Sequence, residues 1–207
     1  MYFSRKCKIT FISHGATIYT EEGRFSDKNN YPPLTDAGIE EIEKITEFLR
    51  LRGIRNDKIY TSAATRTVQS AQIIAKLYKK KYEIIEDLDA RKCGAFSGWS
   101  LEQIEHRFPN AFNALINNPE ICTPEDAESL NDFIKRVSAS IDNIVNKNIS
   151  NRIIIVTHPD VIKAAICDAL NIPAASLPKI YIKTGSATQI SYFESWKSLI
   201  YSDYTPV

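Results

Sequence analysis

Short runs of apolar and β-branched residues alternate along the chain with longer stretches in which apolar residues recur every three or four positions. The short runs predict strands, at residues 8–12, 58–61, 82–85, 153–156, 180–182 and 187–193. The longer stretches predict helices, at residues 35–53, 63–80, 126–146 and 159–170, and a capping-box pattern of Ser100 with Gln103 begins a further helix. This alternation predicts an α/β fold with a mostly parallel sheet that helices cover on both faces.

The composition is that of an ordinary globular domain. The chain has 207 residues, of which 43% are hydrophobic and 25% charged, and it contains no repeat or Pro/Gly-rich linker. We therefore expect a single domain over residues 1–207. The formal net charge of +1 gives no general attraction to nucleic acid or to an anionic membrane, so we expect neither as a partner.

The sequence carries no pattern that would direct it to a membrane or out of the cell. No apolar run approaches the ~20 residues that span a bilayer. The N-terminal apolar run has no small-residue cleavage pattern after it, so we do not expect a signal peptide. Four scattered cysteines without a CxxC pair are then typical of free thiols in a reducing compartment, and we expect a cytoplasmic protein.

Two of the three histidines stand where predicted strands end: His14 follows the first strand and His158 follows the strand at 153–156. A single histidine at such a position is often an ordinary polar loop residue. Ligand sites in parallel sheets form beyond the carboxyl ends of strands, however, and neighbouring strands would bring this pair together. The third histidine, His106, lies within a helical segment without a partner pattern.

Metal and nucleotide motifs are missing around this pair. No HExxH motif, carboxylate cluster or Cys/His spacing supplies a third and a fourth metal ligand. Gly15 stands alone after the first strand, so there is no Rossmann or Walker phosphate loop. We expect neither a metal nor an organic cofactor.

Six short motifs occur in a particular order along the chain. They are Ser13-His14-Gly15, the segments 33–38 and 61–71, Gly94-Ala95-Phe96-Ser97-Gly98, Glu128-Ser129-Leu130 and Val156-Thr157-His158. In this order and spacing the chain resembles the histidine phosphatase (phosphoglycerate-mutase-like) superfamily, in its smaller branch, from about residue 8 to 193. The resemblance implies a three-layer α/β/α sandwich.

The resemblance also implies a phosphoryl-transfer site. His14 matches the nucleophile that becomes phosphohistidine, Arg66 a phosphate-clamping arginine, and His158 the second histidine of the pocket. A neutral imidazole can attack phosphorus, and a guanidinium can hold phosphoryl oxygens with two parallel hydrogen bonds. The other candidate phosphate-binding residues are Ser13, Gly15, Thr20 and Arg24.

Three pocket positions depart from the family pattern. Ser13 stands in place of an arginine, Ala90 in place of the general-acid glutamate, and Pro159, which has no N–H, in place of a glycine. A positioned acid contributes about 10²–10⁴ in rate when the leaving group needs a proton. Asp89, next to the vacant acid position, is the catalytic candidate to replace it, and Asp160 is a second.

Arg24 and Arg91 are candidates to replace the missing positive charge. With these departures, we expect a phosphatase that acts on a small phosphorylated metabolite through phosphohistidine. Without the acid, activity should favour acidic leaving groups, as in acyl, diphosphate or aryl substrates. The alternative hypothesis is a non-catalytic anion-binding or protein-interaction pseudoenzyme that binds inorganic phosphate or a similar anion. A mutase is the third hypothesis. Residues 98–128 should form a lid, while substrate identity and oligomeric state stay open.

Overall fold

A six-stranded sheet forms the centre of the computed structural model, which describes residues 5–27 and 31–206. The strands lie in the order β3-β2-β4-β1-β5-β6. Their bounds are β1 Arg5–Ser13, β2 Lys58–Thr61, β3 Tyr82–Ile84, β4 Arg152–Thr157, β5 Ala187–Phe193 and β6 Lys197–Tyr204. The first four strands are parallel to one another, and β5 and β6 join in antiparallel pairs. The sheet is therefore mostly parallel, as predicted.

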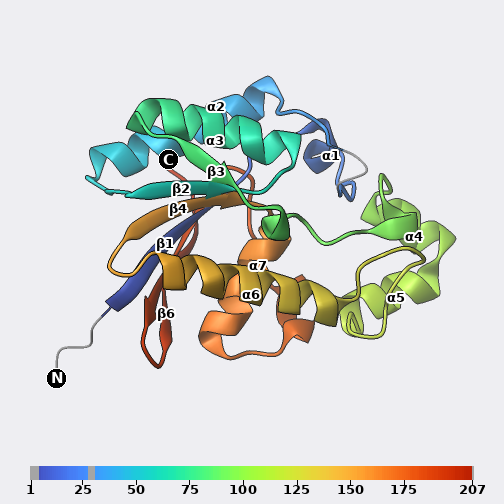
Figure 1. The fold of residues 1–207 in the computed structure, drawn as a ribbon. Helices are drawn as coiled ribbons and strands as arrows, with labels where there is room; N and C mark the ends of the chain where they lie inside the picture. The colour runs from blue at the N-terminus through green and yellow to red at the C-terminus, as the bar shows by residue number, and fades with distance from the viewer. Residues whose placement is uncertain (1–4, 28–30, 207) are drawn as a thin grey trace.

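Helices cover both faces of the sheet. The α-helices are α1 Ile18–Glu21, α2 Asp36–Leu51, α3 Thr65–Tyr78, α4 Leu101–Arg107, α5 Pro109–Asn117, α6 Leu130–Lys147 and α7 Pro159–Leu170. The 3-10 helices are η1 Glu86–Leu88, η2 Gly94–Phe96 and η3 Ala174–Lys179. Helices α2 and α3 lie on one face and α6 and α7 on the other (Figure 1). The predicted three-layer α/β/α sandwich is confirmed.

Strand β4 shows why the sheet is buried on both faces. Ile153 and Ile155 pack into the core with α6 and α7, whereas Ile154 and Val156 pack into the core with α2 and α3. Successive side chains of a strand point to opposite faces, so a continuous apolar run is what a strand between two helical layers requires.

Capping residues decide where three helices begin. The Oγ1 atom of Thr35 accepts a hydrogen bond from the Gly38 N–H, which starts α2 at the predicted place. The helix predicted over 126–146 begins only at Leu130, because Ser129 caps it and Asp126 has a φ of +57° that no right-handed helix accommodates. The predicted capping box of Ser100 with Gln103 is present at the start of α4.

The strand predicted at 180–182 is wrong. This segment follows η3 outside the sheet, Tyr181 is 72% exposed, and β6 occupies the position beside β5. Strand β6 and helix α5 were not predicted. In β6 the residues Leu199, Ile200 and Tyr201 are consecutive, and this edge strand lacks the clean alternation of a half-buried strand.

No helix in the described part of the chain combines the length and the apolar character needed to cross a bilayer. Residues 1–4, 28–30 and 207 of the predicted single domain lie outside the described residues.

Candidate active site

The ends of two adjacent strands bring the two histidines together. In the parallel pair of β1 with β4, Ser13 is in register with Thr157, so His14 and His158 are the next residues on neighbouring strands. The His14 N–H donates to the Thr157 carbonyl at 2.9 Å. The two rings lie with their centroids 5.3 Å apart and are both buried. The prediction that the two imidazoles meet is confirmed.

Arg66, in the first turn of α3, joins the two rings. Its Nε donates to His14 Nε2 at 3.1 Å, and its Nη2 donates to His158 Nδ1 at 3.1 Å and to the Ser26 carbonyl at 3.4 Å. The side chain is only 2% exposed. Its third nitrogen, Nη1, is buried and has no hydrogen-bond partner among the described residues. Two N–H donors are thus left unused in a buried position.

The contacts of Arg66 determine the protonation of both rings. A guanidinium can only donate, so His14 Nε2 and His158 Nδ1 must carry lone pairs. The proton of His14 is then on Nδ1, which donates to the Gly15 carbonyl at 2.8 Å. The proton of His158 is on Nε2, which lies 2.8 Å from Ser62 Oγ. His14 therefore presents an unprotonated Nε2, the form that a nucleophile requires.

Electrostatics keep both imidazoles neutral. Burial, then the charge of Arg66, then His158 lower the pKa of His14 well below its ordinary value. Burial and Arg66 likewise lower the pKa of His158, although Asp89 and Asp160 oppose the shift. At pH 7 both rings are therefore free bases.

Asp89 lies behind His158 and does not line the cavity. Its Oδ1 accepts from the Ala63 N–H at 3.0 Å and is 3.7 Å from His158 Nε2, the nitrogen that faces away from Arg66. Burial raises the pKa of Asp89, but the interactions with His158, Ser62 and Ala63 outweigh this and leave it below its ordinary value. Asp89 is thus an ionised carboxylate close to His158 but beyond hydrogen-bond distance, and the expectation that it replaces the general acid does not fit this geometry.

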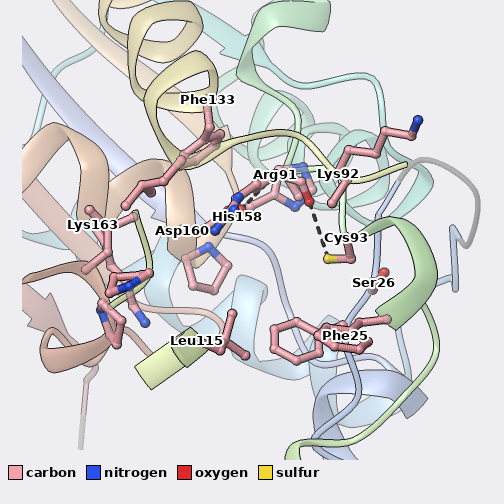
Figure 2. Close-up of a pocket in the computed structure, with 18 of the residues that line it drawn as sticks. Phe25, Ser26, Arg91, Lys92, Cys93, Leu115, Phe133, His158, Asp160 and Lys163 are labelled. Carbon is pink, nitrogen blue, oxygen red and sulfur yellow. Dashed lines mark hydrogen bonds between the residues drawn. The ribbon is translucent and has the colours of Figure 1, made fainter. Parts of the chain in front are cut away.

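A cavity of about 400 Å³ opens beside the three polar residues. His14, Arg66 and His158 form one part of its wall, and most of the remainder is apolar. The apolar wall is made by side chains from α5, α6, η3 and the loops between 117 and 130, including Leu115, Ile116, Pro119, Pro124, Leu130, Phe133 and Leu177. Figure 2 shows His158 and Asp160 near the centre of the view, with Phe25 and Leu115 across from them.

The other predicted phosphate-binding residues are placed differently. The Ser13 hydroxyl is buried without a partner among the described residues and does not line the cavity. The Gly15 N–H donates to Ser70 Oγ at 3.3 Å. Thr20 and Arg24 do line the cavity, but the Thr20 hydroxyl donates to the Thr17 carbonyl.

The guanidinium of Arg24 is occupied as well. It donates to the Gly98 carbonyl at 2.9 Å and pairs with Glu22. Arg24 therefore lines the cavity with part of its guanidinium engaged, and Ser13 offers only a neutral hydroxyl where the family arginine would stand.

The position expected to hold an acid does line the cavity, but as Ala90. Asp160 also lines it, and both of its oxygens are occupied, Oδ2 by the Arg91 N–H at 2.6 Å and Oδ1 by the Val161 N–H at 2.9 Å. The Arg91 guanidinium donates to the carbonyls of Glu128 and Cys122. Both side chains therefore line the cavity with part of their hydrogen-bonding capacity already used within the protein.

Two residues that support the site were not predicted. Ser62, which holds His158, directly follows β2, so the strand-end argument applied to the histidines would also have found it. The Ser26 carbonyl that receives Arg66 lies in a loop and has no sequence signal. No group of three or more His, Cys, Asp or Glu residues that could hold a metal ion occurs in the described ranges.

Comparison with known proteins identifies the family. The profile of the histidine phosphatase superfamily (branch 1) matches residues 9–201. The chain belongs to this superfamily. It is 28% identical over 160 residues to phosphoglycerate mutase-like protein 4 of Arabidopsis thaliana and 26% identical over 176 residues to fructose-2,6-bisphosphatase of Saccharomyces cerevisiae. These matches cover 76% and 84% of this chain, but 68% and only 36% of the two relatives.

Solved structures of the superfamily share the fold over nearly the whole chain. The superposition on Bacillus stearothermophilus YhfR has a TM-score of 0.88 at 22% identity and covers 97% of this chain and 98% of the other. The α-ribazole phosphatase of Shigella flexneri gives 0.83 at 21% identity, with coverage of 97% and 98%. Entamoeba histolytica phosphoserine phosphatase in complex with 3-phosphoglyceric acid gives 0.85 at 20% identity, with coverage of 96% and 98%.

Proposed function

We propose that this member of the superfamily is a phosphatase that hydrolyses a small phosphorylated metabolite through a phosphohistidine at His14. The observation that carries the proposal is the Arg66 guanidinium, which holds the His14 lone pair on one side and keeps two buried donors unused on the other. A buried donor without an acceptor is costly, and a phosphoryl oxygen would satisfy it. Relatives named as phosphatases support the same chemistry.

The first step forms a bond between His14 Nε2 and phosphorus while the bond from phosphorus to the leaving oxygen breaks. Arg66 Nε occupies the lone-pair direction of Nε2, so it must turn toward the substrate before attack. Anion binding drives that turn, because phosphoryl oxygens can accept two parallel hydrogen bonds from the guanidinium and add a charge–charge attraction that a neutral imidazole lacks. Water then attacks phosphorus, the N–P bond breaks, and the proton of water leaves with inorganic phosphate or solvent.

The leaving oxygen departs without a protein proton in this mechanism. Ala90 has no acidic group, Asp160 already accepts a backbone N–H at each oxygen, and Asp89 lies behind His158. The substrates that we propose therefore have leaving groups that are stable as anions, such as carboxylates, phosphates and phenolates.

Residues 98–128, which include helix α5 with Leu115 and Ile116 in the cavity wall, would act as the lid. We place the protein in the cytoplasm, a proposal that rests on its four free thiols.

The test is a series of aryl phosphates of rising leaving-group pKa, measured with the wild type and with His14→Ala. We expect kcat/KM to fall steeply along the series and turnover to disappear in the variant. His106→Ala, the same change at an exposed histidine of α4, is the matched control and should retain full activity. A rate that is flat along the series would contradict the missing-acid proposal, and turnover that survives His14→Ala would contradict the nucleophile.

A non-catalytic anion-binding protein is the second candidate. The contact of Arg66 Nε with the His14 lone pair favours it, because a guanidinium that stays there blocks attack. In that case phosphate would bind to the wild type and not to Arg66→Met, and no aryl or acyl phosphate would turn over.

A further inference from the structure

The cavity is larger and more apolar than a phosphoryl group requires. Its volume of about 400 Å³ is at the lower end of the range for small-molecule sites, and its wall beyond the histidines is mainly hydrophobic. Among the described residues, the cationic side chains that line it are Arg24, Arg66, Arg91, Lys92 and Lys163. Their remaining bonding capacity indicates what else the cavity can bind.

Three of these cations already have partners or a role in the protein. Arg66 belongs to the phosphate site, Arg24 pairs with Glu22, and Arg91 donates to two backbone carbonyls. Figure 2 shows the Lys92 side chain extending away from His158 and Asp160. Lys163 lines the cavity without such a partner among the described residues, so its whole ammonium is open to a second polar group of a ligand.

Lys163 lies on α7, five residues after His158, and is half-buried. It lines the cavity on the side opposite Phe25 and Cys93 (Figure 2). Within the described ranges it has no hydrogen bond or ion pair, and the oxygens of nearby Asp160 are used by backbone N–H groups. Burial lowers the pKa of Lys163, and the charge of Asp160 opposes this shift.

We propose that the leaving group of the substrate has an apolar body that ends in a carboxylate, and that the Lys163 ammonium binds this carboxylate. The inference rests on the proposed phosphatase function and specifies its substrate class. A single ammonium beside the Asp160 carboxylate fits a monoanion better than a second phosphate, because a dianion would bring more charge than one donor group can neutralise. Helices α5 and α6 would cover the apolar body between the two charged ends.

The test compares the binding of benzylphosphonate with that of 4-carboxybenzylphosphonate by calorimetry. Phosphonates have no hydrolysable P–O–C bond at this position, so the measurement is independent of turnover. In the wild type, we expect the carboxylate to tighten binding about 10- to 100-fold, the usual effect of one charge-assisted hydrogen bond. Lys163→Met should abolish this gain and leave benzylphosphonate binding unchanged, whereas Lys92→Met should retain the gain.

Each other outcome overturns the inference in an identifiable way. Equal affinity of the wild type for the two phosphonates, or a gain that persists in Lys163→Met, would exclude Lys163 as the binding group. If Lys92→Met lost the tighter binding of 4-carboxybenzylphosphonate, Lys92 and not Lys163 would be the group that binds the carboxylate. If the wild type hydrolyses aryl phosphates, any of these results refutes the substrate class alone. If neither phosphonate binds and nothing is hydrolysed, the phosphate site fails and the carboxylate site with it.

Discussion

The charge of Arg66 should reduce stability while serving function, and Arg66→Met separates the two effects. The guanidinium is 2% exposed and forms no ion pair with a described carboxylate; its bonds go to two neutral imidazoles and a carbonyl. Burial accordingly lowers the pKa of Arg66, although the charges of Asp160 and Asp89 oppose this. Desolvation of a buried ion costs several kcal/mol even when it has a partner.

The size of the expected stability change follows from the desolvation cost of this unpaired ion. Replacing a buried ion pair by apolar residues is neutral or stabilising by about 1–4 kcal/mol, and here the ion is not even paired. The imidazole nitrogens freed by Arg66→Met face a cavity with room for water, which limits the loss of their hydrogen bonds. We expect the free energy of unfolding to rise by about 1–3 kcal/mol, or the melting temperature by about 2–12 °C for a chain of this size.

The assay is urea and thermal unfolding at pH 7 without phosphate, together with turnover of an aryl phosphate. Loss of two charge-assisted contacts to the phosphoryl group should lower kcat/KM of Arg66→Met by about 10²–10⁴ or more. Arg55→Met, at an exposed position, is the control and should change stability by less than about 0.5 kcal/mol. A destabilisation of Arg66→Met by more than about 1 kcal/mol would refute the reasoning.

Three further predictions concern pH, the missing acid and backbone packing. Because His14 and His158 have lowered pKa values in the folded state, the unfolded chain binds more protons than the folded one below pH ~6.5. The free energy of unfolding should therefore fall as the pH decreases, by up to about 1.4 kcal/mol per pH unit for each histidine. Urea unfolding at pH 7, 6 and 5 measures this, and a flat profile would be inconsistent with buried neutral rings. Ala90→Glu should raise the hydrolysis of alkyl phosphates about 10²–10⁴-fold and barely affect aryl phosphates, and an unchanged alkyl rate would show that the cavity cannot use an acid there. Gly15→Ala should destabilise the fold by about 3 kcal/mol or more, because its Cβ would lie 2.1 Å from the Gly38 carbonyl oxygen; wild-type stability in thermal unfolding would contradict this close approach.

The sheet and the histidine pair were predictable from local patterns. The apolar runs of β1 and β4 are buried on both faces, and parallel neighbours bring their ends to one edge, so His14 and His158 had to meet once the two strands paired. Arg66 was predicted only through the family resemblance, since a basic residue in the first turn of a helix is otherwise ordinary.

Features that depend on tertiary contacts were beyond the sequence. Strand β6 is defined by pairing with β5 rather than by alternation of its own side chains. The orientation of Asp89 behind His158 depends on the backbone N–H of Ala63, which no side-chain pattern reports. The same holds for the unpaired charge of Lys163, because only the packing of α7 against the cavity shows which cations are already occupied.

The most direct test of the central claim is to trap the covalent intermediate. The protein is mixed rapidly with an acyl or aryl phosphate, quenched in alkali, which preserves phosphohistidine, and analysed by intact and peptide mass spectrometry. We predict that the wild type gains one phosphoryl group on the peptide that contains His14, and that His14→Ala gains none. Substrate turnover without any phosphorylated His14, or phosphorylation of another residue in its place, would contradict the account.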